Sequence, residues 1–148
     1  MRVVLQRVRR ASVTVDGREV ASIGPGYLLL VGIGADDADG EVERMADKVL
    51  ALRLFADDAG KTNLALDAVD GEVLVVSQFT LYADLRKGRR PSWTDAAAPE
   101  VAAERVEAFA RALEDRGARV GRGTFGAHMQ VELLNDGPFT LILEDAGS

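Results

Sequence analysis

The sequence predicts a single α+β domain, in which a mainly antiparallel sheet curls into a barrel-like shape and two helices pack on it. Three observations lead to this fold class. Short alternating or continuous apolar runs, which are typical of strands, fill the first and last thirds of the chain. Two segments between them repeat their apolar residues with the period of a helix. The length of 148 residues suits one domain, and no linker or internal repeat divides residues 1–148.

The first third of the chain predicts strands joined by a hairpin. Asp16-Gly17 is a strong signal for a two-residue hairpin turn. The run YLLLVGIG at 27–34 is too short for a buried helix and contains two glycines, so it predicts a central strand. The other strands expected in this part cover residues 3–8, 11–15 and 19–23.

The middle of the chain predicts two amphipathic helices. The first begins after Gly40, and its apolar residues have the spacing i, i+3, i+4, i+7: Val42, Met45, Ala46 and Val49. The second begins at Pro99, where a first-turn proline costs no hydrogen bond, and ends at Gly117. Its expected buried residues are Val106, Phe109, Ala110 and Leu113. Strands are expected at 52–55 and 73–79, separated by a polar loop.

The last third alternates again between apolar and polar residues. Met129, Val131 and Leu133 form the apolar set, and His128, Gln130 and Glu132 form the polar one. The residues Asn135-Asp136-Gly137-Pro138 then predict a tight turn that leads into a closing strand at 139–143.

Composition excludes several kinds of protein. The chain has no cysteine, which rules out disulfides, thiolate metal sites and a cysteine nucleophile, and which fits a reducing compartment. The first residues contain no continuous apolar core of signal-peptide length, and no later apolar run approaches the ~18 residues of a membrane span. We therefore expect a soluble, cytoplasmic protein with no membrane partner.

The charge distribution points to a local anionic partner. A net charge of -6 argues weakly against nucleic acid, because the long-range field repels phosphate. However, eight of the 18 basic residues fall in two short stretches: Arg2, Arg7, Arg9 and Arg10, and Arg86, Lys87, Arg89 and Arg90. A locally basic face suits a nucleic acid that is held at one place and released. A merely solvated loop explains the charges equally well.

Few residues offer catalytic chemistry. His128 is the only histidine, and its place opposite the apolar set predicts an exposed side chain. The G-x-S-x-G and H-E-x-x-H motifs are absent, and no metal-spaced cluster occurs, so we expect no metal and no cofactor. Two polar segments remain: Ser77-Gln78-Phe79-Thr80-Leu81 at a strand end, and 135–140. On physical grounds alone, backbone satisfaction explains the first as well as a site does, and a β-turn explains the second better.

A family resemblance changes this balance. The stretches MRVVLQRV, SQFTLYADLRKGRRPSW and FGAHMQVELLNDGPFTL cover nearly the whole chain and resemble the D-aminoacyl-tRNA deacylase family. The signature is specific because SQFTL is paired with N-D-G-P-x-T, with the basic run RKGRRP between them. The related L-alanine-removing deacylases differ in the first motif and lack the Gly-Pro pair. The chain departs from the pattern at Phe139, where a smaller β-branched residue is expected.

The resemblance implies an activity and an assembly. The substrate would be D-aminoacyl-tRNA, and also glycine mischarged on alanine tRNA. The protein would be a homodimer with composite active sites, in which Gly137-Pro138 of one subunit, joined by a cis bond, enters the pocket around Ser77 to Thr80 of the other. Arg7 would brace the inserted loop.

The resemblance also suggests how the chemistry proceeds. Ser77, Gln78, Phe79 and Thr80 would shape the catalytic site. Thr80 has no evident base to activate it, so we favour water activated by the ribose 2′-hydroxyl of the RNA over an acyl-Thr80 intermediate. Arg86, Lys87, Arg89 and Arg90 are candidates for phosphate contacts.

Two rival functions stay open at the level of the sequence. One is a dimeric RNA-binding module without turnover, which would use the basic loop and need nothing from SQFTL. The other is a serine-type hydrolase of small esters, which would be built on Ser77 and His128.

Overall fold

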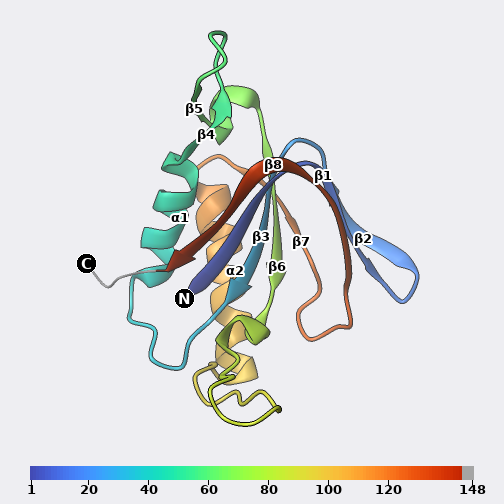
Figure 1. The fold of residues 1–148 in the computed structure, drawn as a ribbon, viewed down its shortest axis with the longest axis vertical. Coiled ribbons are helices and arrows are strands. Elements are labelled where there is room, and N and C mark those ends of the chain that lie inside the picture. Colours follow the sequence, from blue (N-terminus) through green and yellow to red (C-terminus); the bar gives the residue numbers. More distant parts are fainter. Residues whose placement is uncertain (145–148) are drawn as a thin grey trace.

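The long first strand, β1 (Arg2–Val15), pairs with three other strands and forms the centre of their arrangement (Figure 1). The computed structural model describes residues 1–144. The strands are β1 (Arg2–Val15), β2 (Arg18–Ile23), β3 (Gly26–Gly32), β4 (Arg53–Ala56), β5 (Thr62–Ala65), β6 (Glu72–Ser77), β7 (Arg119–Arg122) and β8 (Gln130–Glu144). The helices are α1 (Glu41–Ala51) and α2 (Pro99–Asp115), with 3-10 turns η1 (Leu66–Val69) and η2 (Phe79–Tyr82).

The sheet is mixed, with antiparallel pairing predominant. β1 pairs with β8 along nearly its whole length, and on its other edge it pairs first with β3 and then with β2, all antiparallel. β3–β6 and β6–β7 are parallel. Parallel neighbours need a crossover connection, and α1 and α2 lie in the two crossovers. The predicted curled sheet with two packed helices is correct, but the parallel part and β7 were not foreseen.

The core has two parts, one on each face of the central strands. On one face Tyr27, Leu29 and Val75 pack against α1 and α2, which contribute Met45 and Phe109. On the other face the curled ends of β1, β2 and β8 enclose a second cluster: Val8, Ala11, Val13, Ile23, Leu28, Leu74 and Val76. β3 and β6 are therefore buried on both faces, which explains their continuous apolar runs.

The predicted hairpin and both helices are confirmed. Asp16 and Gly17 have φ angles of 50° and 76°, as the tight turn between β1 and β2 requires. Gly40, with φ 82°, precedes α1, and Pro99 opens α2. Phe109, Ala110 and Leu113 are buried, whereas Val106 is only partly buried. No helix among residues 1–144 is long and apolar enough to span a membrane.

Several predicted boundaries are wrong. The strands expected at 3–8 and 11–15 form one strand, because two register shifts near Val8 let β1 bend without breaking. The polar loop between 55 and 73 contains β5 and η1. The strand expected at 73–79 ends at Ser77, and Phe79 opens η2 instead.

Residues 135–138 do not form a turn between two strands. β8 runs through them and stays paired with β1 on both sides, with Asn135 opposite Val8 and Thr140 opposite Gln6. Between these pairs β8 bulges away from its partner. Because Pro138 has no N–H to donate to the ladder, a bulge is where a strand accommodates it. We call residues 136–139 the Gly-Pro bulge.

Candidate active site

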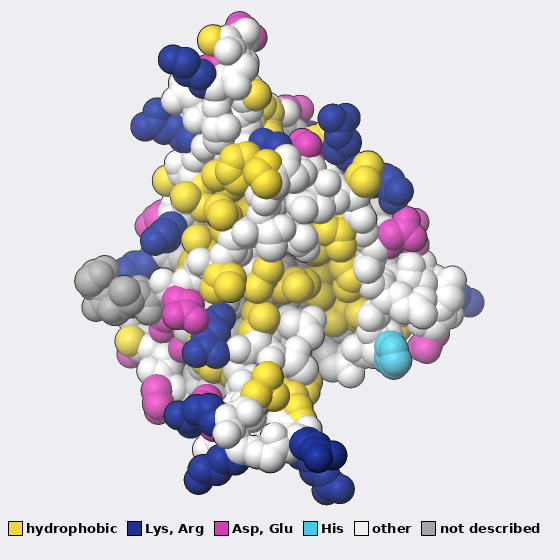
Figure 2. All heavy atoms as spheres, viewed as in Figure 1, with side chains coloured by type: hydrophobic (Ala, Val, Ile, Leu, Met, Phe, Trp, Pro, Cys, Tyr) yellow, Lys and Arg dark blue, Asp and Glu magenta, His cyan; other side chains and the backbone are white. Residues whose placement is uncertain are grey.

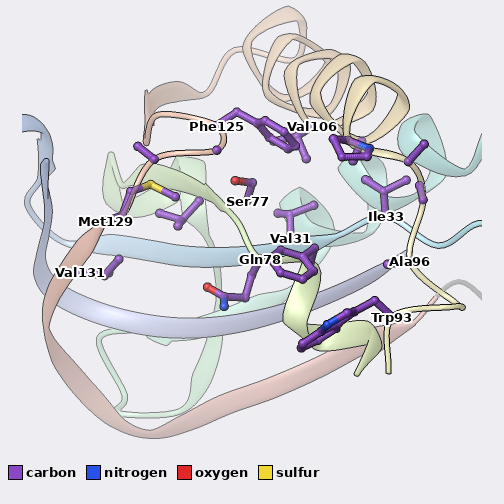
Figure 3. Close-up of a pocket in the computed structure, with 18 residues that line it drawn as sticks. Val31, Ile33, Ser77, Gln78, Trp93, Ala96, Val106, Phe125, Met129 and Val131 are labelled. Atoms are coloured by element: carbon purple, nitrogen blue, oxygen red, sulfur yellow. The ribbon is translucent and has the colours of Figure 1, made fainter. Parts of the chain in front are cut away.

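A cavity of 640 Å³ opens where β6 ends (Figure 3). Its floor comes from Val31 of β3 and Val76 of β6, and Val106 of α2 forms part of the wall. Residues 96–99, 125–127 and Met129 complete the enclosure. Val106 is only partly buried because it faces this space. The lining is predominantly apolar, as in most sites that bind organic ligands.

Three large aromatic side chains in the lining remain exposed. Phe79, Trp93 and Phe125 are 54%, 42% and 41% exposed. Phe79 and Trp93 meet edge to face, with ring centroids 4.9 Å apart. Trp93 is the only tryptophan of the chain. Exposed rings around an apolar cavity offer flat surfaces on which nucleic-acid bases stack.

The SQFTL motif supplies the polar groups beside the cavity. Ser77 and Gln78 line it, and the Gln78 amide donates a hydrogen bond to the Thr80 hydroxyl oxygen. Phe79 and Thr80 open η2, and the first N–H groups of a helix have no acceptor within the helix. The lining residues include no Asp, Glu, His, Lys or Arg. The cavity can therefore orient a ligand and donate hydrogen bonds, but it supplies no charged base.

His128 does not complete a serine triad. Its side chain is exposed, as the alternation predicted, and the neighbouring Ala127 and Met129 line the cavity instead. No hydrogen bond joins His128 to Ser77 in the described part of the chain. The positions of His128 and Ser77 therefore do not support the serine-type hydrolase hypothesis.

The second motif, N-D-G-P-x-T, builds the Gly-Pro bulge. The Asn135 side-chain amide donates to the backbone oxygens of Arg7 and Phe139, at 2.8 and 3.1 Å. It thus ties the two ends of the bulge together and fastens them to β1. The peptide bond between Gly137 and Pro138 is cis.

The Arg7 side chain, from β1, holds the bulge by hydrogen bonds to its backbone. Its Nε donates to the Asp136 backbone oxygen at 3.1 Å, and its Nη2 donates to the Gly137 oxygen at 3.3 Å. Its Nη1 donates to the Leu54 oxygen of β4 at 2.5 Å. Only 12% of the Arg7 side chain is exposed. One guanidinium therefore connects β1, β4 and the bulge.

Aromatic rings surround the Arg7 guanidinium. Its carbon lies 4.6 Å from the centroid of the Phe139 ring and 5.9 Å from that of Phe55. Phe55 stacks on Tyr27, with centroids 5.4 Å apart. Burial raises the pKa of Tyr27, so its phenol stays neutral and adds no charge beside Arg7.

Within one chain, the bulge and the cavity lie apart. Arg7 pairs with Tyr27, whereas Ser77 pairs with Val31, which in turn pairs with Val3. Four residues of strand separate these levels, or about 13 Å at ~3.3 Å per residue. Neither Gly137 nor Pro138 lines the cavity. The structure therefore does not bring the two motifs together in a single chain.

Gly137 is not required by the fold of one chain. A Cβ atom placed there would find only the Asn135 Oδ1 within 4 Å, at 3.9 Å. Its φ angle is not in the left-handed region that favours glycine. The fold of one chain therefore gives no steric reason for a glycine at this position.

The basic run at 86–90 forms the tip of a loop. Asp84 and Ser92 close this basic loop with two backbone hydrogen bonds. Arg86 makes a bidentate contact with the Asp84 carboxylate, and these hydrogen bonds lower the pKa of Asp84 to about 2. Within this run, the exposed side chains of Lys87, Arg89 and Arg90 form no ion pair with any residue of 1–144. Figure 2 shows basic side chains at this end of the molecule.

The other basic stretch serves mainly structural contacts. Arg2 donates to the Leu81 oxygen and lies 4.5 Å from the Tyr82 ring centroid. Arg7 holds the bulge, and Arg10 pairs with Glu132 at 2.8 Å. Arg2, Arg7 and Arg10 of this stretch are therefore engaged within the chain, whereas Arg9 is exposed and forms no ion pair with any residue of 1–144.

Fold and site together match enzymes that act on aminoacyl-tRNA. A family model described as D-Tyr-tRNA(Tyr) deacylase matches residues 4–144. A "D-aminoacyl-tRNA deacylase" of Roseiflexus castenholzii is 58% identical over 99% of this chain and 93% of its own. One of Clostridioides difficile is 50% identical over 100% of this chain and 99% of its own. These matches define an ester hydrolase of aminoacyl-tRNA.

Solved structures agree on the fold. A "c-Myc DNA Unwinding Element Binding Protein" superposes with a TM-score of 0.90 at 41% identity, covering 97% of this chain and 98% of the other. A probable eukaryotic D-amino acid tRNA deacylase gives a TM-score of 0.82 at 20% identity, over 96% and 97%. The chain belongs to the D-aminoacyl-tRNA deacylase family. It hydrolyses the ester bond of D-aminoacyl-tRNA, and the rival function without turnover is set aside.

Sequence reasoning missed three residues of this region. Trp93 and Phe125 join the cavity from loops, and Asn135 ties the bulge. A lone tryptophan in a polar stretch was the available signal for Trp93. The sequence places Asn135 in a turn and in the N-D-G-P-x-T motif, but it does not reveal the hydrogen bond to Arg7, which lies 128 positions away.

The basic loop yields a prediction that contains its own control. Arg89→Gln and Arg90→Gln should each reduce the slope of log affinity for tRNA against log salt by about 0.7–0.9, if each contacts one phosphate. Arg86→Gln should change it less, because Asp84 already neutralises that guanidinium. Filter-binding titrations across a salt series measure the slopes. Unchanged slopes for Arg89 and Arg90 would mean that the loop is only a solvated surface.

Proposed function

We propose that the protein works in the cytoplasm as a homodimer with two composite active sites, removing D-amino acids from tRNA and glycine from alanine tRNA. The observation that carries this proposal is the separation of the two motifs in one chain. Gly137 and Pro138 lie opposite Arg7, four residues of strand from the level at which Ser77 borders the cavity, and neither of them lines it. Two copies related by a two-fold axis place the bulge of each over the cavity of the other.

Exposed apolar surface supports an assembly of this kind. Leu134 and Ile142 of β8 are 46% and 73% exposed. Figure 2 shows hydrophobic side chains gathered on the face that carries β8. A contiguous apolar surface of this kind on a soluble protein favours a partner. A symmetric homodimer is the commonest such assembly, and it buries the same patch on both copies.

Chirality follows from steric exclusion at the bulge. Backbone oxygens of the bulge accept hydrogen bonds from the substrate α-ammonium, while the ester carbon lies beside SQFTL. With both points held, an L side chain collides with Gly137 and Pro138, whereas a D side chain points to solvent. Glycine has no side chain and is accepted. One site thus cleaves many D substrates and spares L-aminoacyl-tRNA.

The RNA itself completes the chemistry. The ribose 2′-hydroxyl next to the ester positions a water, whose oxygen attacks the carbonyl carbon. The bond between the carbonyl carbon and the ribose 3′ oxygen then breaks, and the 3′ oxygen takes up the proton that the attacking water has lost. N–H groups of Phe79 and Thr80 stabilise the developing oxyanion. Ser77, Gln78 and Thr80 shape the site. An amide cannot accept a proton, so the contact from Gln78 does not activate Thr80 as a nucleophile.

Outside the catalytic segment, the proposal gives two groups of residues a role. Arg7 braces the substrate-binding pair Gly137 and Pro138 through its hydrogen bonds to the bulge. Lys87, Arg89 and Arg90 contact tRNA phosphates, because their charges have no counterion among residues 1–144. Arg86 contributes less, since it is paired with Asp84.

The chemical scheme predicts a contrast between an enzyme variant and an RNA variant. Thr80→Ala should keep substantial deacylation, because the hydroxyl is not the nucleophile. A substrate with a 2′-deoxy terminal adenosine should lose nearly all of it. Single-turnover rates on D-tyrosyl-tRNA measure both. Trapping of an acyl-Thr80 adduct, or full activity on the 2′-deoxy substrate, would contradict the scheme.

The composite site predicts complementation between two inactive variants. Gly137→Ala should fold with unchanged stability, since one chain has room for the Cβ, and should lose activity because that Cβ enters the partner's cavity. Ala96→Trp should fill the cavity. Each heterodimer of the two carries one site with both halves intact, so purified heterodimers should show about half of the wild-type activity, and an equal, freely exchanging mixture about a quarter. Mixtures that stay inactive although heterodimers form would disprove a composite site.

A further inference from the structure

Phe139 directly follows the Gly-Pro pair, and its side chain occupies a specific place. Its side chain is half-buried and packs against the edge of the larger core cluster. Its ring lies over the Arg7 guanidinium, with 4.6 Å between the guanidinium carbon and the ring centroid. This distance is well inside the range of a cation–π contact.

The covered guanidinium is the one that holds the bulge. Arg7 donates to the Asp136 and Gly137 backbone oxygens and, on its other branch, to Leu54. The bond to Gly137 is the longest of the three, at 3.3 Å. A guanidinium donates in its own plane, so any tilt of that plane weakens this bond first.

A ring on one face of Arg7 limits such tilting. Arginine stacks on aromatic faces with its plane free to donate at the edges. The ring also keeps water off that face, and a lower local dielectric strengthens the bonds from the guanidinium to the two carbonyl oxygens. The backbone of Phe139 contributes too, since its oxygen accepts a hydrogen bond from the Asn135 side chain at the base of the bulge.

We infer that Phe139 is a specificity-determining positioning residue, whose ring holds the Arg7 guanidinium in the plane that orients the Gly137 carbonyl. The inference rests on the proposed function, because the oriented carbonyl is the proposed acceptor for the substrate ammonium. Phe139 is not among the residues that line the cavity. It acts through Arg7 on the position of the bulge, and hence on the discrimination between D and L substrates.

The test uses substitutions that separate the loss of the Phe139 ring from a general loss of packing in the core. Phe139→Leu keeps an apolar side chain but removes the ring, and Phe139→Tyr keeps the ring. Leu141→Val is the matched control, because it trims the same strand and the same core cluster without approaching Arg7. For each variant, kcat and KM on D- and L-tyrosyl-tRNA and the melting temperature are measured.

The ratio of kcat/KM for D over L substrate should fall by about 2- to 30-fold in Phe139→Leu, the range that a cation–π contact supports. The loss should appear in kcat, since tRNA contacts elsewhere set KM. Phe139→Tyr and Leu141→Val should keep the wild-type ratio. If Phe139→Leu does not fold, Phe139→Met provides the same comparison.

Two outcomes would overturn the inference. In one, Phe139→Leu and Leu141→Val lower the melting temperature alike and leave the D-over-L ratio unchanged, so that the ring serves packing only. In the other, Phe139→Tyr loses as much selectivity as Phe139→Leu. A wild-type enzyme that fails to discriminate D from L would instead contradict the proposed function, so the two failures are distinguishable.

Discussion

The hydrogen bonds from the Arg7 guanidinium to the Gly-Pro bulge are the constraint on which the account of this protein depends. A bulge in a strand frees backbone oxygens from the ladder, and free oxygens move unless something holds them. Arg7 holds two of them, and its third contact extends to β4. The guanidinium is nearly buried, so its donors have little competition from water. These contacts make the bulge rigid, as the proposed steric exclusion of L side chains by its backbone requires.

The cavity offers binding surface but no charged catalytic group. Its lining residues carry no charged side chain, and the only hydroxyl–amide pair beside it, Thr80 and Gln78, cannot take up a proton. In the proposed scheme, the chemistry of hydrolysis therefore falls on an ester that is already reactive and on the hydroxyl next to it. What the protein contributes is position. In this scheme the apolar cavity and the exposed aromatic rings hold the RNA end, and N–H groups of the SQFTL segment stabilise the oxyanion.

Periodicity predicted most of the fold, because each helix and most strands bury one face and so carry a readable pattern. β7 was missed, since the short sequence RVGR has only one apolar side chain. The bulge was taken for a turn because Asn, Asp, Gly and Pro favour turns, and only the pairing of β8 with β1 on both sides distinguishes the two. The significance of SQFTL and N-D-G-P-x-T follows from the family resemblance and not from periodicity. Their separation in one chain, the contacts of Arg7 and the ring of Phe139 over it depend on strand register, which sequence spacing does not reveal.

The central claim is that a fixed backbone wall rejects L side chains by steric exclusion, and a graded set of substrates tests it most directly. Initial rates are measured on one tRNA carrying glycine, D-alanine, D-tyrosine, L-alanine or L-tyrosine. Exclusion predicts that glycine and both D substrates are hydrolysed at similar rates, because their side chains are absent or point to solvent, and that even the single methyl group of L-alanine blocks the reaction. Rates on D substrates that depend strongly on side-chain size, or hydrolysis of L-alanine as fast as glycine, would contradict it.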